Sequence, residues 1–512
     1  MMRDLLMGVD IGTHGSKGVL VSTGGQVVSQ AFVDHGVDTE RVGQFEQDAD
    51  EVWWGDLKRI TKGLAAQRQV DPRSIAGVGI SALCPDMLPV DETGQPLRKA
   101  ILYHDTRAEK ERHEQLARLG AATIAEATGQ PLHSQCVGPK IAWFRDHEPD
   151  LFGRTWKILT ASSFLVHKLT GQPVLDYGTA CGFGPLFDIR ARQWNSRFCR
   201  ELGLSVDMLP NLCQATQVVG EVSTWAAGET GLAEGTPVIA GTCDTFAGQV
   251  GVGVVEPGEA VLIYGSSMDV LLVLGDDLSP PSKLGISVGV VPGTLVSGTT
   301  MTTAGSLTRW FRDNFGQIET DVEERLGLNA YHLLSDQAAE VACGSAGLLV
   351  FPHFAGAPYW DPLARGCIVG LTPLHSRKHV YRALLEGIAY GLRHNLEAMQ
   401  SGHLDLKRIV SVGGGTRSRV WTQIVSNVTG RDQEVVAHPS GAAYGDAFLA
   451  GYGVGLFRDP AEIRERWVRV TDRVRADAEA KNTYDKYYAA YERLYDGVKE
   501  TMHALAPLSA LD

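Results

Sequence analysis

The sequence predicts an α/β protein whose two related halves flank a central cleft, and three observations support this prediction. Short apolar strands alternate with longer amphipathic stretches along the chain, an order typical of α/β folds. The length of 512 residues is sufficient for at least two domains with sizeable cores. Finally, a strand, a turn of small residues and a returning strand occur near the N-terminus and again near residue 260.

The first of these hairpins spans residues 5–21. An apolar strand runs into Gly8-Val9-Asp10-Ile11-Gly12-Thr13-His14-Gly15-Ser16-Lys17, and a second apolar strand returns. Glycines allow backbone N–H groups to approach an anion, and a carboxylate such as that of Asp10 can hold a hydrated Mg²⁺. The hydroxyls and the ammonium that could reach phosphate oxygens belong to Thr13, Ser16 and Lys17. The segment therefore predicts part of a magnesium–nucleotide site, and a plain glycine hairpin is the alternative.

Similar segments recur further along the chain. The strand Val238-Ile239-Ala240 ends in Gly241-Thr242-Cys243-Asp244, and residues 260–271 repeat the layout of strand, small-residue turn and strand. A strand over residues 409–412 then enters the triplet Gly413-Gly414-Gly415, which a helix over residues 420–428 follows. Two halves with matching hairpins suggest a duplicated nucleotide clamp.

The remaining pattern adds strands over 75–81 and 100–103 and helices over 108–119, 141–147 and 380–399. Apolar residues recur at helical spacing over 484–498, which indicates a C-terminal helix that packs against the protein. We place a domain boundary near residue 250. Residues 1–250 then hold the first hairpin and Asp244, and residues 251–512 hold the second hairpin and the glycine triplet.

Composition excludes several classes of protein. The formal net charge of −13 disfavours a nucleic-acid binder, because phosphate backbones require a basic face. The eight cysteines form no C-x-x-C pair and no zinc-type spacing with histidine, so we expect reduced, structural thiols. No signal peptide and no apolar run of about 20 residues is evident, which predicts a cytoplasmic protein without a membrane partner. The G-x-x-x-x-G-K-[ST] loop and the complete dinucleotide fingerprint are also missing.

At this point the chain resembles the FGGY carbohydrate kinases of the sugar kinase, Hsp70 and actin superfamily of ATPases, along nearly its whole length. Gly8–Thr13 is similar to the family's first phosphate motif, and Gly241-Thr242-Cys243-Asp244-Thr245-Phe246-Ala247-Gly248 is similar to its G-x-x-D-x-x-A-G segment. Residues 366–371 with 379–387 resemble the C-terminal signature. Residues 304–310 and the glycine triplet resemble the segments on the adenosine side. The resemblance implies two actin-like, ribonuclease H-like domains.

The resemblance also implies roles for individual residues. Asp244 matches the catalytic base, with a helix cap as its structural alternative, and Asp10 with Asp244 is the expected metal site for Mg²⁺. The cofactors implied are ATP and Mg²⁺. The expected ATP-binding residues are Gly12, Thr13, Ser16, Lys17, Gly265, Ser266, Gly305, Arg309, Gly414, Gly415 and Ser418. We also expect the halves to rotate together when sugar binds, which excludes water from the reaction.

The sugar side departs from the family pattern. Xylulokinases carry a Q-M-H-G type motif where this chain has Leu83-Cys84-Pro85-Asp86. We expect the sugar contacts to be Cys84, Pro85, Asp86, Asp105, Gln135 and Asp244. The predicted reaction is ATP-dependent phosphorylation of a ketopentose such as D-xylulose. A polyol or other sugar kinase of the same fold is the alternative, and a non-catalytic ATP-switching protein is the rival from another class. The oligomeric state stays open, a homodimer included.

Overall fold

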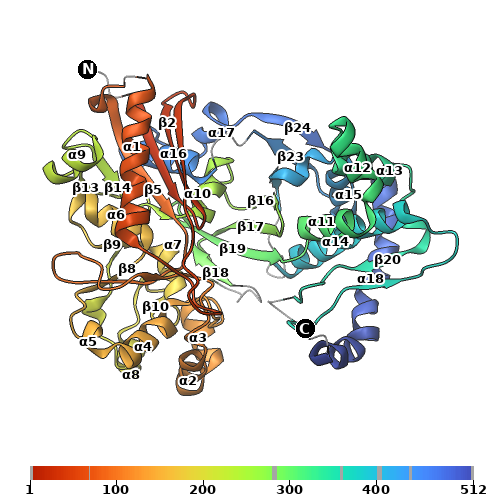
Figure 1. Ribbon diagram of the computed structural model, residues 1–512, viewed down its shortest axis with the longest axis horizontal. Helices are drawn as coiled ribbons and strands as arrows, with labels where there is room; N and C mark the ends of the chain where they lie inside the picture. The colour runs from red at the N-terminus through yellow and green to blue at the C-terminus, as the bar shows by residue number, and fades with distance from the viewer. Residues whose placement is uncertain are drawn as a thin grey trace.

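The computed structural model describes residues 4–68, 70–278, 285–357, 361–399, 406–437 and 441–508. It contains two large mixed sheets that lie side by side, with helices around them (Figure 1). The first sheet is built from residues 5–243 and the second from residues 259–474.

The first sheet is centred on the predicted N-terminal hairpin. Its spatial order is β3 (Val27–Asp34), β2 (Gly15–Ser22), β1 (Leu5–Ile11), β5 (Ile75–Ala82), β14 (Pro237–Ile239) and β13 (Val218–Glu221), and β15 (Thr242–Cys243) also pairs with β5. The pairs β1–β2, β2–β3 and β13–β14 are antiparallel, whereas β5 runs parallel to β1 and to β14. Asp10 lies opposite Lys17 in the β1–β2 register.

The second sheet repeats this arrangement. Its order is β18 (Ile286–Val288), β19 (Thr294–Met301), β17 (Met268–Gly275), β16 (Glu259–Tyr264), β22 (Arg408–Val412), β23 (Gln433–Val436) and β24 (Val470–Val474). From β19 to β24, the sequence of antiparallel and parallel pairs is the same as that from β3 to β13. The predicted duplication and the predicted α/β class are therefore confirmed, as two halves with one actin-like sheet topology.

Helices cover both sheets. Those before the second sheet are α1 (Gly55–Arg68), α2 (Glu109–Leu119), α3 (Ala121–Thr128), α4 (Val137–His147), α5 (Pro149–Phe152), α6 (Ala161–Thr170), α7 (Tyr177–Ala180), α8 (Ser196–Glu201), α9 (Thr224–Thr230) and α10 (Asp244–Gly251). The later ones are α11 (Gly305–Phe315), α12 (Gln317–Leu326), α13 (Ala330–Ala339), α14 (Arg377–Met399), α15 (Arg419–Thr429), α16 (Ala442–Gly453), α17 (Glu462–Arg466) and α18 (Ala478–Leu505).

Short strand pairs complete the fold. They are β4 (Glu46–Gln47) with β7 (Ala100–Ile101), β6 (Leu88–Val90) with β8 (Lys157–Leu159), β9 (Val174–Asp176) with β12 (Asn211–Cys213), β10 (Phe187–Asp188) with β11 (Gln193–Trp194), and β20 (Leu349–Phe351) with β21 (Cys367–Val369). None of the helices in the described ranges is long and apolar enough to cross a membrane.

Helix α16 connects the two halves, because it lies between β23 and β24 of the second sheet in the chain yet packs on β1, β5 and α10 of the first half. The contact is made backbone to backbone through glycines. A Cβ added at Gly8 would lie 1.8 Å from the carbonyl oxygen of Ala443, and one at Gly79 would lie 2.3 Å from that of Asp446. Small residues on both sides therefore let α16 approach the sheet closely.

Most predicted elements are present with shifted ends. The predicted C-terminal helix is α18, whose Tyr484, Tyr488 and Tyr491 are buried. The predicted helix over 141–147 begins earlier, at Val137, because Pro139 falls in the first turn, where its missing N–H is not needed. The predicted strand over 100–103 ends at Ile101.

Candidate functional site

Four aspartates gather where α10 and α16 meet the ends of β1 and β5, and we call Asp10, Asp86, Asp244 and Asp446 the aspartate cluster. Asp10 is the penultimate residue of β1, and Asp244 is the first residue of α10. Asp86 follows β5, and Asp446 lies on α16. The charge of Asp244 raises the pKa of each of the other three, so the four carboxylates are close enough to interact.

Asp10 is linked to α16 through Ser81. The Oγ of Ser81 lies 2.6 Å from Oδ2 of Asp446 and 3.4 Å from Oδ1 of Asp10. Ser81 and Asp446 are fully buried, whereas Asp10 is partly exposed. A helix of the second half thus contacts, through one hydroxyl, the carboxylate at the end of the first strand.

Asp244 does not cap its helix. The N-cap of α10 is Cys243, and Oδ1 of Asp244 accepts hydrogen bonds from N (2.6 Å) and Oγ1 (3.0 Å) of Thr245. Its Oδ2 has no hydrogen-bond partner among the described residues, and the residue is partly exposed. The alternative interpretation as an N-cap is therefore wrong, because the helix begins at residue 244 itself. One carboxylate oxygen remains available for a ligand.

Burial and mutual repulsion make these carboxylates reluctant to ionise. Burial and then the charge of Asp244 raise the pKa of Asp10 to about 8, and the hydrogen bond from Ser81 opposes this shift. Burial is also the main cause that raises the pKa of Asp244, and it places the pKa of Asp86 and of Asp446 well above the usual range. Strongly perturbed carboxylates in one place are typical of functional sites.

We expect the Asp10→Asn variant to become progressively more stable than the wild type as the pH rises from about 5 to about 8. The folded wild type holds a proton on Asp10 that the unfolded chain has lost above its pKa of about 4, so its stability falls with rising pH, by on the order of 1 kcal/mol per pH unit. Urea unfolding of both proteins at several pH values measures this difference. A difference that is constant or shrinks with rising pH would contradict the shift.

The aspartate cluster fits a hydrated magnesium ion better than a directly ligated one. In the ranges that the structure covers, no three histidine, cysteine, aspartate or glutamate side chains converge closely enough to hold a metal. Mg²⁺ usually takes one or two carboxylates and fills its other positions with water and substrate phosphate. Asp10 and the free Oδ2 of Asp244 are compatible with that donor set.

The turn between β1 and β2 holds the first group of predicted phosphate contacts. Gly12 and Thr13 lie in this turn, and Lys17 lies opposite Asp10, near enough that its charge lowers the pKa of that carboxyl. Ser16 is different. Its side chain is fully buried and its Oγ donates to Oδ2 of Asp56 at 2.6 Å. The prediction that Ser16 contacts phosphate is therefore wrong, because β2 directs this hydroxyl into the core.

The second group of predicted nucleotide contacts lines one cavity of about 590 Å³ in the second half. Of the predicted residues, its wall contains Gly265, Ser266, Gly305, Arg309, Gly414, Gly415 and Ser418. Residues outside the predicted set of ATP contacts complete it, namely Tyr264, Thr308, Asn329, Tyr331, His332, Ser335, Tyr381, Arg417 and Trp421. A Cβ at Gly414 would meet nothing within 4 Å, whereas one at Gly305 would lie 2.3 Å from the carbonyl oxygen of Gly265. The size and the aromatic wall suit an adenosine.

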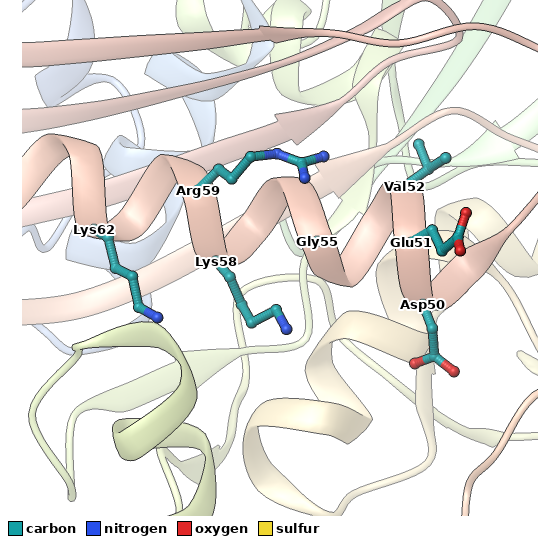
Figure 2. A pocket seen from close by; sticks show the side chains of 7 residues that line it. All are labelled: Asp50, Glu51, Val52, Gly55, Lys58, Arg59 and Lys62. Carbon is teal, nitrogen blue, oxygen red and sulfur yellow. The ribbon is translucent and has the colours of Figure 1, made fainter.

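A larger hollow of about 690 Å³ runs along the outer face of α1, and Figure 2 shows the side chains that line it. Lys58 pairs with Glu229 at 3.3 Å, Asp50 pairs with Lys168 at 3.0 Å, and Arg59 pairs with Asp56. Because these three charges are already paired with neighbours, they offer little to a charged ligand. We therefore do not assign the functional site to it.

The predicted sugar side contains an unsatisfied carboxylate. Asp86 is fully buried, and its Oδ2 accepts the backbone N–H of Ala161 at 2.9 Å, while Oδ1 has no partner among the described residues. The charge of Lys140 opposes the rise in the pKa of Asp86. Lys140 is itself fully buried, donates to the carbonyl oxygens of Tyr103 (3.1 Å) and Gln135 (2.9 Å), and has its pKa lowered by burial to about 8.

The other predicted sugar contacts lie in different surroundings. Cys84 is partly exposed and Pro85 is buried between it and Asp86. The pKa of the Cys84 thiol is raised, chiefly by a hydrogen bond with the thiol of Cys243 and then by burial, so Cys84 lies beside the residue that precedes Asp244. Gln135 is exposed and contributes its carbonyl oxygen to Lys140.

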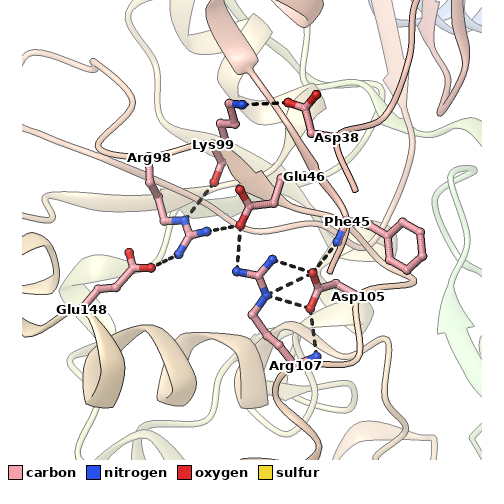
Figure 3. Close-up of polar contacts among 8 residues, drawn as sticks. All are labelled: Asp38, Phe45, Glu46, Arg98, Lys99, Asp105, Arg107 and Glu148. Carbon is pink, nitrogen blue, oxygen red and sulfur yellow. Dashed lines mark hydrogen bonds and ion pairs between the residues drawn. The ribbon is translucent and has the colours of Figure 1, made fainter. Parts of the chain in front are cut away.

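Asp105 is occupied by an ion pair (Figure 3). Its carboxylate accepts two N–H groups of the Arg107 guanidinium, at 2.9 and 2.7 Å, and the backbone N–H of Phe45 at 2.7 Å. Arg107 also pairs with Glu46 at 2.7 Å, and Glu46 pairs with Arg98. The prediction that Asp105 contacts sugar is therefore wrong, because both of its oxygens are used within the protein.

We expect Asp105→Asn to reduce stability rather than sugar affinity. The change leaves the buried Arg107 guanidinium with Glu46 as its remaining carboxylate partner, and breaking a buried ion pair costs about 3–5 kcal/mol. Chemical unfolding should show this loss as a lower free energy of unfolding. The folded fraction of the variant should have a KM for the sugar close to that of the wild type. An unchanged midpoint together with a large rise in that KM would restore Asp105 to the sugar site.

Comparison with known proteins agrees with this geometry. Residues 5–251 match the N-terminal domain model of the FGGY family of carbohydrate kinases, and residues 260–454 match its C-terminal domain model. A xylulose kinase of Staphylococcus epidermidis is 29% identical over 98% of each chain, and a gluconokinase of Bacillus subtilis is 28% identical over 89% of this chain and 88% of its own. The crystal structure of a xylulose kinase from Rhodospirillum rubrum superposes with a TM-score of 0.90 at 27% identity and covers 98% of this chain and 100% of its own.

Proposed function

We propose, from the premise that the chain belongs to the FGGY family of carbohydrate kinases, that it transfers the γ-phosphoryl group of MgATP to a hydroxyl of a ketopentose such as D-xylulose. Membership makes the chain a sugar kinase, an enzyme that phosphorylates an alcohol group. The observation that carries the proposal is the partly exposed Asp244, whose Oδ2 is free beside Asp10 and Asp86.

Asp244 is proposed as the catalytic base. A free hydroxyl is a poor nucleophile, so a carboxylate within hydrogen-bond reach must take its proton as the phosphoryl group is transferred. The two hydrogen bonds from Thr245 fix one oxygen of Asp244 and leave the other for the sugar. The raised pKa of Asp244 supports this role, because a more basic carboxylate accepts a proton more readily.

Asp10, with Asp244, is proposed to hold Mg²⁺ through water. When bound, this ion would neutralise charge on the phosphates of the nucleotide. The chain supplies the hydrogen bond from Ser81 that restrains Asp10 and the nearby ammonium of Lys17. Thr13 and Lys17 would then bind the phosphates together with Gly265 and Ser266, while Gly305, Arg309, Gly414, Gly415 and Ser418 enclose the adenosine.

Asp86 is proposed as the main sugar contact, with Cys84, Pro85 and Gln135 around it. Its unpartnered Oδ1 can accept a hydrogen bond from a sugar hydroxyl, and a buried acceptor without a partner costs about 1–3 kcal/mol, which that hydroxyl would relieve. Polyol and other sugar kinases remain the second candidate, because the fold and the phosphate side would be the same. The gluconokinase among the relatives makes an aldonate a further member of that group.

The experiment is a coupled ADP-release assay with D-xylulose, other ketoses, polyols, D-gluconate and glycerol as acceptors. We expect D-xylulose or a related ketopentose to give the highest kcat/KM. Asp86→Asn should raise the KM for that sugar about tenfold and leave the KM for MgATP unchanged, since one hydrogen bond from a sugar hydroxyl to a buried acceptor oxygen is lost. A higher kcat/KM with a polyol or an aldonate would favour the second candidate, and no activity with any acceptor would favour a non-catalytic ATP switch.

Two further proposals accompany this function. All eight cysteines are free, which supports a reducing location such as the cytoplasm. The chain divides near residue 250, between α10 of the first half and β16 of the second. A homodimer stays a prediction from the sequence. Size-exclusion chromatography with light scattering would test this oligomeric state.

A further inference from the structure

The turn between β1 and β2 has every carbonyl oxygen of residues 12–15 bonded within the protein. Two of the four bonds come from the backbone, since Gly15 O accepts from Gly12 N at 3.1 Å and His14 O accepts from His35 N at 3.3 Å. The other two come from side chains. Gly12 O accepts from Nε2 of His35 at 3.0 Å, and Thr13 O accepts from Nε2 of Gln47 at 2.9 Å.

Two amides of the same turn are free. The N–H groups of Thr13 and His14 have no hydrogen-bond partner among the described residues. In a planar trans peptide the C=O and the N–H point in opposite directions. The bond from His35 to Gly12 O therefore directs the N–H of Thr13 away from His35, and the bond from Gln47 to Thr13 O does the same for the N–H of His14.

His35 is itself held by a buried carboxylate. Its Nδ1 lies 2.7 Å from Oδ2 of Asp56, and this side chain is fully buried. Asp56 also accepts from Ser16 at 2.6 Å and pairs with Arg59. Burial tends to raise the pKa of Asp56, but the hydrogen bonds from His35, Ser16 and Arg59 together lower it, so its oxygens act as acceptors. Each ring nitrogen of His35 thus faces an oxygen of the protein, the Asp56 carboxylate at Nδ1 and the Gly12 carbonyl at Nε2.

Gln47 is equally constrained. It is 1% exposed, its Oε1 accepts the indole N–H of Trp53 at 2.9 Å, and its Nε2 donates to Gly36 O at 3.1 Å as well as to Thr13 O. These three hydrogen bonds fix the side-chain amide of Gln47 in its contact with the turn. Two side chains, that of His35 before β4 and that of Gln47 within it, hold consecutive peptide units in one orientation.

We propose that His35, fixed by Asp56, is a positioning residue for the phosphate end of the nucleotide, and that Gln47 assists it. The proposal rests on the proposed function, in which this turn receives the β- and γ-phosphates. His35 acts through the Gly12 carbonyl and does not itself touch phosphate. Without the bond, the peptide between Gly12 and Thr13 can rotate, which removes an N–H donor and brings a carbonyl oxygen toward the anion.

Two substitutions at His35 separate these contacts. In His35→Gln, the side-chain amide nitrogen takes the position of Nε2 and can still donate to Gly12 O. In His35→Asn, the amide nitrogen takes the position of Nδ1, so the bond to Asp56 remains and the bond to Gly12 O is lost. His147→Ala is the control, because this exposed histidine also donates to a helix carbonyl, that of Trp143, on α4.

Each protein is tested for the Kd of MgADP without sugar, the KM for MgATP, the KM for the sugar and the thermal midpoint. For His35→Asn we expect MgADP binding and the KM for MgATP to weaken about five- to tenfold, which is the usual value of one hydrogen bond. The KM for the sugar and the midpoint should stay close to those of the wild type. His35→Gln should recover most of the nucleotide affinity, and His147→Ala should change nothing.

Equal nucleotide affinity in the wild type and His35→Asn would overturn the proposal, as would an equal loss in His35→Gln and His35→Asn. A parallel rise in both KM values together with a lower midpoint would show a merely structural role. The MgADP arm needs no phosphoryl transfer. If the wild type phosphorylates no sugar, the proposed function fails while the effect of His35 on nucleotide affinity can still be measured.

Discussion

The Asp244→Asn variant should fold, bind MgATP with nearly the affinity of the wild type, and lose about a thousandfold in kcat. An amide at this position cannot take the proton of the sugar hydroxyl, and a positioned base contributes roughly 10²–10⁴ to the rate. The amide is isosteric with the carboxylate, and the N–H and hydroxyl of Thr245 can still donate to its oxygen. Single-turnover transfer of labelled phosphate from ATP to the sugar measures the loss directly.

Asp150→Asn on α5 is the matched control, because this exposed aspartate lies outside the aspartate cluster. It should leave kcat, both KM values and the thermal midpoint unchanged. If Asp244→Asn retained near-normal turnover, another group would have to be the base. If it lost nucleotide affinity to the same extent as kcat, Asp244 would act mainly as a metal-binding residue.

The Gly445→Ala variant should lose both stability and activity through backbone displacement. A Cβ at this position would lie 1.9 Å from the carbonyl oxygen of Ala247 and 2.9 Å from the N of Gly251, both in α10. Helices α16 and α10 must then separate, and overpacking of this kind costs about 1–3 kcal/mol. Because α10 begins at Asp244, a shift near 1 Å should also lower kcat by about a hundredfold.

Gly497→Ala in α18 is the control for the glycine change itself. A Cβ there would meet nothing within 4 Å, and the residue lies inside a helix, where alanine is favoured by about 1 kcal/mol. Urea unfolding should therefore show a lower midpoint for Gly445→Ala and an unchanged or higher one for Gly497→Ala. Full activity and stability in Gly445→Ala would mean that the contact between α16 and α10 does not position Asp244.

The hairpins and their duplication could be predicted from the sequence because each combines an apolar run with a turn of small residues, both of which are local signals. The cavity glycines Gly265, Gly305 and Gly414 could be predicted from the family resemblance, because each lies at the start or end of a turn in the family's sequence pattern. The direction of a side chain on a strand is harder to predict. Ser16 and Lys17 are adjacent in β2, and only the tertiary pairing decides that the first is buried and the second is not.

Several residues of the site gave weak signals that sequence reasoning did not use. Asp446 is the one acid in the apolar segment 442–450, and Lys140 is a lone cation in the run 136–144, so each is a charge in a context that predicts burial. The spacing of Asp105 and Arg107 is typical of a local turn, and Oδ1 of Asp105 indeed accepts the backbone N–H of Arg107 at 3.0 Å. His35 carried no such signal, because its partners are distant in the sequence.

The central claim is that Asp244 takes a proton from a sugar hydroxyl while Asp10 holds the magnesium of ATP. A crystal structure with Mg²⁺, a non-hydrolysable ATP analogue and the preferred sugar tests it most directly. We predict that Oδ2 of Asp244 lies within about 3 Å of the hydroxyl to be phosphorylated, with that hydroxyl facing the γ-phosphate and Asp10 beside the metal. A sugar bound away from Asp244, or a carboxylate of Asp244 turned away from its hydroxyls, would contradict the account.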